Sequence, residues 1–406
     1  MYIFSYLFIR HFCSLSIVFL SFFCLSCDNG HSEKISFDRS DAAKSIAIDP
    51  IKVYATSKIN NGSEIDFMKL NCDTSLMFSS ISKFQPIDKS RFLIVDKTNN
   101  KIYVSDDSGK LYTKIGERGS ALGQYTTVTD VEYDMNTDLI YVFSLPERKM
   151  LTYTTEGKFV DEKFSAFDFL TFTKRSNGYL VYGAFESNIE NPYLNRNKKN
   201  NSNLIFISDD LSRILAGYIN SGNFYDRMNN NDNFLQVKTD LSYFHYGYND
   251  TIYCIDKSRI YPVYNIDFGK YQFPYEKASV FNNRKAYDLL YFKDEDPYYG
   301  ITAKLSIGNE IVYMEYGPLK PSRNLGSNSV LYFRKNGNLK HIPSQLEQIP
   351  LHINRVLTIY DDKVYFEIIP RLLSKVNIDS LNAEFNLNIS QESHPLILSV
   401  NEKDLM

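Results

Sequence analysis

The chain has no tryptophan and few cysteines, and neither sign of charge dominates it. Of its 406 residues, 45 are Lys or Arg and 48 are Asp or Glu, which gives a formal net charge of -3. A nucleic-acid-binding domain usually carries a cluster of basic charge on one face. The balanced charge therefore predicts that nucleic acid is not a partner, and it gives no indication of attraction to anionic lipid.

Sequence patterns for metal binding and for catalysis are also absent. Outside the N-terminal apolar run and Cys27, no CxxC pair or Cys/His spacing indicates zinc, and no Gly-x-Ser-x-Gly elbow, phosphate loop or dinucleotide fingerprint occurs in the chain. Histidines are dispersed at His245, His341, His352 and His394, without the spacing of a metal site. We therefore predict no metal, no cofactor and no catalytic residue from motifs.

The N-terminus has the pattern of a secretory signal. Arg10 precedes the apolar run 12–25, which is short for a membrane-spanning helix and is followed by Ser26-Cys27 and a polar segment. The Leu25-Ser26-Cys27 junction resembles a bacterial lipobox, in which the signal is cut before the cysteine and its sulfur receives a lipid. Cys24 departs from that pattern, which prefers leucine three residues before the cysteine, so an ordinary cleaved signal or an uncleaved anchor stays open.

Two cysteines remain in the mature chain, Cys72 and Cys254. They lie far apart in sequence, so a disulfide between them in an oxidising compartment is open but unsupported. The default prediction is that both are buried thiols.

The rest of the chain has the composition of an all-β protein. It contains 31 Tyr and 29 Phe, and short β-branched or aromatic runs alternate with Asn, Asp, Gly and Ser turns. Two similar hairpin sequences, Asp107-Ser-Gly-Lys110 and Thr155-Glu-Gly-Lys158, place Gly109 and Gly157 48 residues apart. A period of about 40 to 50 residues is typical of a four-stranded propeller blade.

Extending this period predicts a six-bladed β-propeller whose N-terminal strand closes the last blade. The six predicted blades span residues 76–115, 129–164, 167–219, 234–268, 301–342 and 355–400. The last blade lacks its outer strand, and Ile51 to Ile59 is predicted to supply it, because this pairing removes exposed sheet edges. The predicted organisation is a lipoprotein signal at 1–27 ending at lipidated Cys27, a flexible tether at 28–50 and one propeller domain at 51–406.

Nearly every predicted long connection falls on one face of the propeller. These connections cover residues 116–128, 184–202, 220–233, 269–300, 317–328 and 370–394, whereas the opposite connections are tight hairpins. Short helices are predicted in two of them, over 275–292 and beginning at the capping residue Asp379. These helices would either cover the channel mouth as a lid or only brace the last blade.

The candidate ligand-binding residues lie in two of these long loops. Arg118 and Tyr125 belong to a glycine-punctuated loop, where a guanidinium can fork a carboxylate or phosphate, or pair instead with Glu117. Asp294, Asp296, Tyr298 and Tyr299 combine acids with tyrosines, a mixture that suits a cation or a sugar and equally describes a solvated acidic turn. The tyrosine-rich run around Tyr243 and Tyr246 is predicted to pack mainly between blades.

The order of several segments resembles a known family. Ile115-Gly-Glu-Arg-Gly-Ser-Ala-Leu-Gly-Gln-Tyr125, Asp250-Thr-Ile-Tyr253, Tyr264-Asn-Ile-Asp-Phe-Gly-Lys270 and Ser393-His-Pro-Leu-Ile-Leu398 are similar to the six-bladed propeller lipoproteins of gut-type Gram-negative bacteria, distant relatives of NHL-repeat propellers. Ala121-Leu122 stands where that family often has Gly-Pro. The resemblance implies a fold and a cell-envelope location, and no agreed activity.

Two functional hypotheses follow. The first is a monomeric, lipid-anchored protein, periplasmic or surface-exposed, that binds a glycan, peptide or protein partner through the long-loop face without catalysis. The alternative is a metal-dependent lyase or hydrolase with its site on the propeller axis. The alternative requires several His, Asp or Glu side chains that converge on the axis.

Overall fold

The computed structural model describes residues 35–405 apart from 39–42, 61, 71–77, 79, 184–201, 221–232, 239, 247–249, 274–297, 319–327 and 347–348. These residues belong to one compact unit, Ile35 to Met406. Cys27 and the predicted helix over 275–292 lie outside the described residues.

Six blades, each with a core of four antiparallel strands, confirm the predicted propeller, and the sheet of blade 4 gains two further N-terminal strands at its outer edge. Blade 1 is β4 (Lys83–Pro86), β5 (Arg91–Asp96), β6 (Lys101–Asp106) and β7 (Leu111–Lys114), and blade 2 is β10 (Asp130–Asp134), β11 (Leu139–Ser144), β12 (Lys149–Thr154) and β13 (Phe159–Phe164). Blade 3 is β14 (Thr171–Arg175), β15 (Gly178–Tyr182), β16 (Ser202–Ser208) and β17 (Ile214–Asn220), and blade 4 is β18 (Phe234–Lys238), β19 (Leu241–Phe244), β20 (Thr251–Ile255) and β21 (Arg259–Asp267). Blade 5 is β22 (Tyr299–Ile307), β23 (Ile311–Pro318), β24 (Asn328–Phe333) and β25 (Leu339–Lys340), and blade 6 is β28 (Ile353–Tyr360), β29 (Lys363–Ile368), β30 (Leu396–Asn401) and β3 (Ile65–Lys69).

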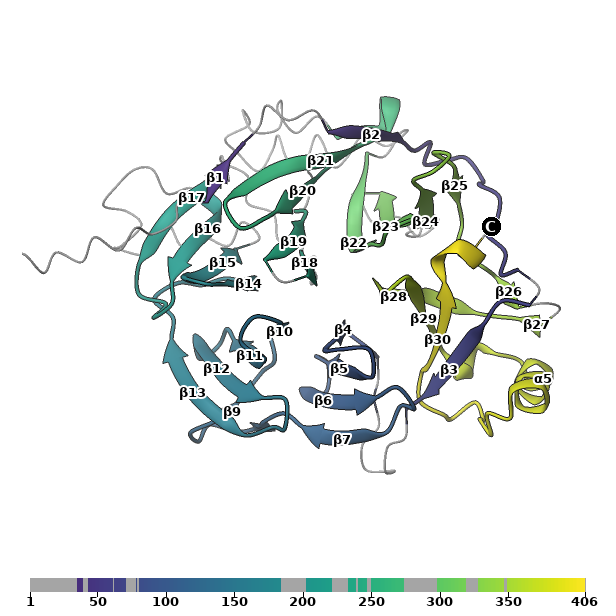
Figure 1. Cartoon of the computed structure of the whole chain (residues 1–406), viewed down its shortest axis with the longest axis horizontal. Coiled ribbons are helices and arrows are strands. Elements are labelled where there is room, and N and C mark those ends of the chain that lie inside the picture. Colours follow the sequence, from purple (N-terminus) through teal and green to yellow (C-terminus); the bar gives the residue numbers. More distant parts are fainter. Residues whose placement is uncertain are drawn as a thin grey trace, which may run out of the picture. The chain divides into compact units, whose positions relative to one another are not determined.

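The innermost strands contact one another in sequence order and close the ring, from β4 through β10, β14, β18, β22 and β28 back to β4 (Figure 1). Inner strands such as β5 and β10 are buried on both faces, because each blade packs face to face with its two neighbours. Outer strands such as β7 alternate between half-buried and exposed residues. Burial therefore decreases from the axis outward within a blade.

The N-terminal segment closes the ring with a different strand from the predicted one. Ile65 to Lys69, not Ile51 to Ile59, pairs antiparallel with β30, from Ile65 opposite Val400 to Lys69 opposite Leu396. Thr56, within the predicted strand, forms a bridge with His341 at the outer edge of blade 5. The earlier segment thus covers one sheet edge while the later one completes another, and both remove unpaired backbone groups.

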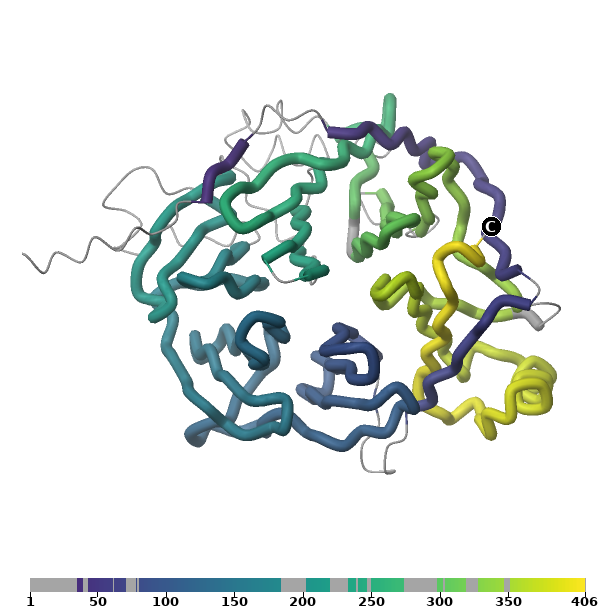
Figure 2. The backbone as a smooth tube through the Cα atoms, in the orientation of Figure 1, coloured from purple at the N-terminus to yellow at the C-terminus, as the bar shows by residue number. Residues whose placement is uncertain are grey.

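The tether predicted over 28–50 also needs correction from Ile35 onward. β1 (Ser36–Phe37) and β2 (Lys44–Ala47) both pair in parallel with β21, the outer strand of blade 4. Figure 2 shows this purple segment following the outer edge of the ring from blade 4 past blade 5 to blade 6. These residues are therefore part of the propeller's outer edge.

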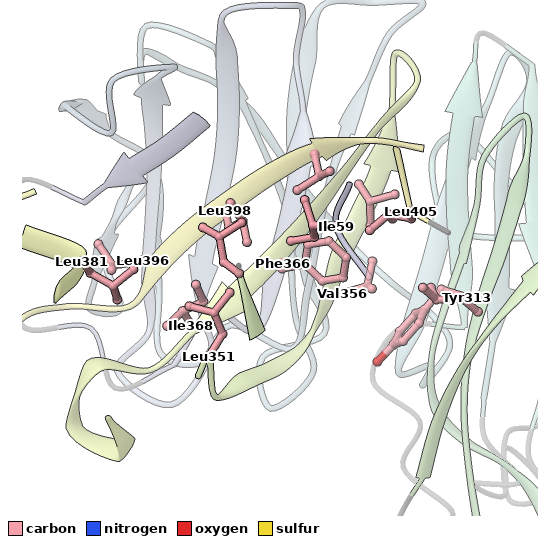
Figure 3. Close-up of a cluster of buried hydrophobic side chains, with 14 of the residues drawn as sticks. Ile59, Tyr313, Leu351, Val356, Phe366, Ile368, Leu381, Leu396, Leu398 and Leu405 are labelled. Atoms are coloured by element: carbon pink, nitrogen blue, oxygen red, sulfur yellow. The ribbon is translucent and has the colours of Figure 1, made fainter. Parts of the chain in front are cut away.

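Helix α5 (Lys375–Phe385) braces blade 6. Its N-cap is Ser374, whose hydroxyl accepts a hydrogen bond from Asn377 N at 3.1 Å, so the helix begins before the predicted Asp379. Leu381 packs into the same buried cluster as Leu396 of β30 (Figure 3). In Figure 1 the helix lies outside the ring of blades, so it is a brace and not a lid over the axis.

The remaining elements are short. They are β8 (Glu117–Arg118), β9 (Gln124–Tyr125), β26 (Gln345–Leu346), β27 (Ile349–Pro350), and the single 3-10 turns η2 (Gly269–Tyr271), η3 (Pro370–Leu372) and η4 (Glu402–Asp404). Within the described ranges, no helix has the length and apolar character needed to cross a membrane. Cys254 is a buried free thiol, as predicted, and Cys72 lies outside the described residues.

Candidate functional site

The axis of the propeller is almost filled by side chains of the innermost strands. The cavity that they line measures about 40 Å³, which is room for a few water molecules. Its lining is largely apolar, with a few polar groups: Lys83, Phe84, Gln85, Pro86, Glu132, Phe172, Phe234, Leu235, Gln236, Lys304, Leu305, Leu357 and Thr358.

Two glutamines from opposite blades meet across this axis. Gln85 Nε2, in blade 1, donates to Gln236 Oε1, in blade 4, at 3.2 Å, and also to the carbonyl oxygen of Tyr133 at 2.8 Å. Gln85 Oε1 in turn accepts from Tyr133 N at 3.0 Å. Both ends of the Gln85 amide are therefore engaged, and the pair of glutamines closes the channel.

Glu132 is the acidic group of the axis lining. It is buried, and it accepts hydrogen bonds from Thr173 Oγ1 at 2.7 Å and from Lys174 N at 2.8 Å, both on blade 3. Burial raises the pKa of Glu132 to about 8, although Lys83 and these hydrogen bonds partly oppose the increase. Glu132 is therefore mainly protonated at neutral pH and links blades 2 and 3.

Asp130 holds a second set of inter-blade contacts. Its Oδ1 lies 3.4 Å from Lys83 Nζ and 3.4 Å from Lys97 Nζ, and its Oδ2 accepts from Phe172 N at 3.2 Å. These contacts join blades 1, 2 and 3 at buried positions. The polar groups on this side of the axis thus have structural partners.

This arrangement does not suit metal-dependent chemistry on the axis. No group of three or more His, Cys, Asp or Glu side chains in the described part of the chain could hold a metal ion. The lining residues contribute one carboxyl group, and the closure by Gln85 and Gln236 leaves no space for a substrate. The enzymatic alternative is therefore not favoured.

A much larger cavity opens at the mouth that carries the tight hairpins. This hairpin-face cavity measures about 700 Å³, and its walls come from blades 2, 4, 5 and 6. It is lined by Met135, Val237, Lys238, Leu241, Tyr243, Ile307, Gly308, Asn309, Arg334, Ile359, Tyr360, Asp361, Asp362 and Glu402. Sequence reasoning placed binding on the opposite face and did not identify Arg334 or Glu402.

Of the two candidate residues in the glycine-punctuated loop, Arg118 is at the surface and Tyr125 is not. Arg118 lies in β8 and is exposed, while Glu117 pairs with Lys114 at 3.2 Å between Oε1 and Nζ. Tyr125 is 0 % exposed, and its hydroxyl donates to the Ile115 carbonyl oxygen at 2.9 Å. Tyr125 is thus a core anchor of the loop, without a surface that a ligand could touch.

The two described candidate residues of the second loop also differ in burial. Tyr298 is half-buried and packs edge-on against Phe273, with ring centroids 5.7 Å apart. Tyr299 is buried in β22 and contacts Tyr271 and Tyr316. Asp294 and Asp296 lie outside the described residues.

The tyrosine-rich run of blade 4 also serves two purposes. Phe244 and Tyr246 are buried in an inter-blade cluster, which confirms the predicted packing role. Tyr243 instead lines the hairpin-face cavity beside Arg334. The alternation of the strand was the available signal, because it places Tyr243 and Phe244 on opposite faces.

A family model described as "Domain of unknown function (DUF4934)" matches residues 48–402. A crystal structure of a Bacteroides fragilis protein thought to be exported is similar, with a TM-score of 0.63 and 17% identity over 88% of this chain and 99% of that one. A DUF4221-family member from Bacteroides vulgatus has a TM-score of 0.47 and 10% identity, covering 84% of this chain and 96% of its own. A Staphylococcus aureus virginiamycin B lyase has a TM-score of 0.41 and 11% identity, and the match covers 83% of this chain and 99% of the lyase chain. These likenesses concern the fold alone. No curated protein matches the sequence.

Proposed function

The chain belongs to the DUF4934 family, and on that premise we propose that it is a monomeric, extracytoplasmic binding protein that does not catalyse a reaction. Its long-loop face recognises a glycan, peptide or protein partner. A lipid on Cys27 anchors it to a membrane of the cell envelope.

The observation that carries this proposal is the separation of long and short connections between the two faces. The chain leaves β15 at Tyr182 and returns at Ser202, and leaves β29 at Ile368 and returns at Leu396. The connections on the opposite face are hairpins such as β28 to β29, from Tyr360 to Lys363. Because a rigid scaffold usually carries binding residues on its long loops, the long-loop face is the preferred partner site.

The location and the anchor rest on the N-terminal sequence. The basic residue, the apolar run and the Leu25-Ser26-Cys27 junction are the features of a lipidated secretory signal. Stable membrane attachment needs two acyl chains, or one acyl chain together with a second membrane contact. Lipidation of an N-terminal cysteine would supply such an attachment. Cys27→Ala should therefore move the protein from the membrane fraction to the soluble fraction.

Binding is tested by a thermal-shift screen of the full-length protein against oligosaccharides and peptides. A ligand at a hundredfold excess over its Kd stabilises the folded state by about 2.7 kcal/mol. The expected result is a ligand-dependent shift that Arg118→Ala or Tyr298→Ala reduces and that Arg213→Ala leaves unchanged, because Arg213 is exposed in a hairpin on the opposite face. A shift that all three variants retain would contradict the assignment to the long-loop face.

A further inference from the structure

The wall of the hairpin-face cavity carries a guanidinium held among aromatic rings. Arg334 Cζ lies 5.7 Å from the centroid of the Tyr264 ring, and its guanidinium interacts with the Tyr243 hydroxyl. Arg334 Nε is buried and has no hydrogen-bond partner among the described residues. A buried donor that lacks an acceptor is costly, so this group is suited to receive an anionic oxygen.

The frame around Arg334 is rigid. Asn309 Nδ2, on the blade 5 hairpin, donates to Asp362 Oδ1, on the blade 6 hairpin, at 2.7 Å. The buried carboxylate of Glu402 accepts from the backbone nitrogens of Asn309, Glu310 and Ile311 at 3.1, 2.9 and 2.8 Å. Two neighbouring hairpins are thereby tied together, and the cavity is preformed.

The other charges of the cavity restrict the class of ligand. Lys238 on blade 4 adds a second cation, which is exposed, whereas Asp361 and Asp362 on blade 6 are exposed acids, and Asp361 Oδ2 lies 3.1 Å from Lys89 Nζ. A polyanion would be repelled by the blade 6 carboxylates. A ligand with one carboxylate and several hydrogen-bond donors instead fits both the cationic wall, at Arg334 and Lys238, and the acidic wall on blade 6. Its carboxylate would face the cations, and carboxylate oxygens of the protein accept from its hydroxyl or ammonium groups.

The geometry points to a second binding site in the hairpin-face cavity, for a small organic monocarboxylate that also carries hydroxyl or ammonium donors. Arg334 and Tyr243 hold the carboxylate, and Asp361 and Asp362 accept from the donors. A volume of about 700 Å³ accommodates a molecule of disaccharide or dipeptide size. This site lies on the face opposite the proposed partner site and does not depend on it.

Calorimetric titration of the full-length protein tests the proposal with four probes: glucuronate, glucose, dialanine and inorganic phosphate. We expect glucuronate or dialanine to bind and glucose to fail, because glucose lacks the carboxylate. Arg334→Met retains an apolar stem beside Tyr264 and should weaken binding about tenfold or more, the usual effect of losing a charge-assisted hydrogen bond. Lys238→Met, at the exposed rim, should weaken it less without affecting folding.

The controls separate this site from general electrostatics and from the long-loop face. Arg213→Met removes an exposed arginine from the same face away from the cavity, and Arg118→Ala removes one from the other face. Both should retain wild-type affinity. The proposal is overturned if neither carboxylate binds, if glucose or phosphate binds as tightly as they do, or if Arg334→Met and Lys238→Met bind glucuronate and dialanine as the wild type does.

Discussion

Replacing Glu132 by glutamine should stabilise the protein at neutral and alkaline pH. Glu132 is buried, and burial raises its pKa from the usual 4.5 to about 8. The folded state therefore binds a proton that the unfolded state releases above pH 4.5. The stability that depends on this proton is fully present below pH 4.5 and is lost as the pH rises through 8.

The size of the effect follows from the two pKa values. Each pH unit that separates them corresponds to about 1.4 kcal/mol, so the full loss above pH 8 is on the order of 5 kcal/mol. At pH 7 about 3 kcal/mol of it has already been lost. Glutamine keeps an oxygen that accepts from Lys174 N, and its amide can donate to the Thr173 hydroxyl, which now bonds Glu132 at 2.7 Å. The variant should thus retain the inter-blade contact without the cost of ionisation.

Urea unfolding of wild type and Glu132→Gln at pH 5, 7 and 9 measures this difference. The advantage of the variant should be small at pH 5 and grow by several kcal/mol toward pH 9, with unchanged m-values. Glu392→Gln, at an exposed position, should show no comparable trend. A difference that is constant across this range, or a variant that is less stable than wild type at pH 9, would refute the reasoning.

Two further variants test how the ring is held closed. Glu402→Ala should lower the free energy of unfolding by about 2 to 4 kcal/mol, because it leaves the Ile311 N–H buried without its acceptor. Urea unfolding measures this loss. In the same assay Lys403→Ala, at the exposed neighbouring position, should change the free energy of unfolding by no more than about 0.5 kcal/mol. Gly109→Ala should lower the melting temperature more than Gly62→Ala. Both glycines have positive φ, at 86° and 83°, but only the new Cβ at 109 would meet a backbone atom, the Lys69 carbonyl oxygen at 2.1 Å. Equal shifts for the two alanines would show that strand β3 does not press on this hairpin.

The blades could be predicted from the sequence because their strands are specified by short-range patterns. Blade 2 was predicted over 129–164 and is observed from Asp130 to Phe164, since β-branched runs alternate with turn residues there. The hairpin glycines Gly109 and Gly157 do adopt positive φ, at 86° and 78°, at equivalent turns between third and fourth strands. Local conformational preference and the overall fold agree at these positions.

The closing strand could not be predicted in the same way. Ile51–Ile59 and Ile65–Lys69 both have strand-like composition, and the choice between them depends on pairing with β30, more than 300 residues away. Only the register of the assembled ring decides which segment reaches blade 6. The helix start was missed for a local reason, because Ser374 and Asp379 are both good capping residues and the earlier one is used.

The polar groups at the axis and in the cavity were missed because their partners lie on other blades. Gln85 and Gln236 form a pair only when blades 1 and 4 face each other across a closed ring. Arg334 acquires aromatic neighbours only when blade 5 packs against blade 4. Tyr125 was assigned to a ligand because its loop was treated as surface, whereas the glycines let that loop fold back and bury the ring.

The closure of the axis decides where a ligand can be bound. An open propeller channel offers one site that both faces share, but Gln85 and Gln236 separate the two mouths here. The long-loop face then offers an extended surface with varied side chains, because its connections are long. The hairpin face offers the opposite qualities: short turns, buried backbone hydrogen bonds to Glu402 and a preformed cavity. The proposed large partner is therefore assigned to the first face and the proposed small carboxylate to the second, since preorganisation lowers the entropy cost of binding.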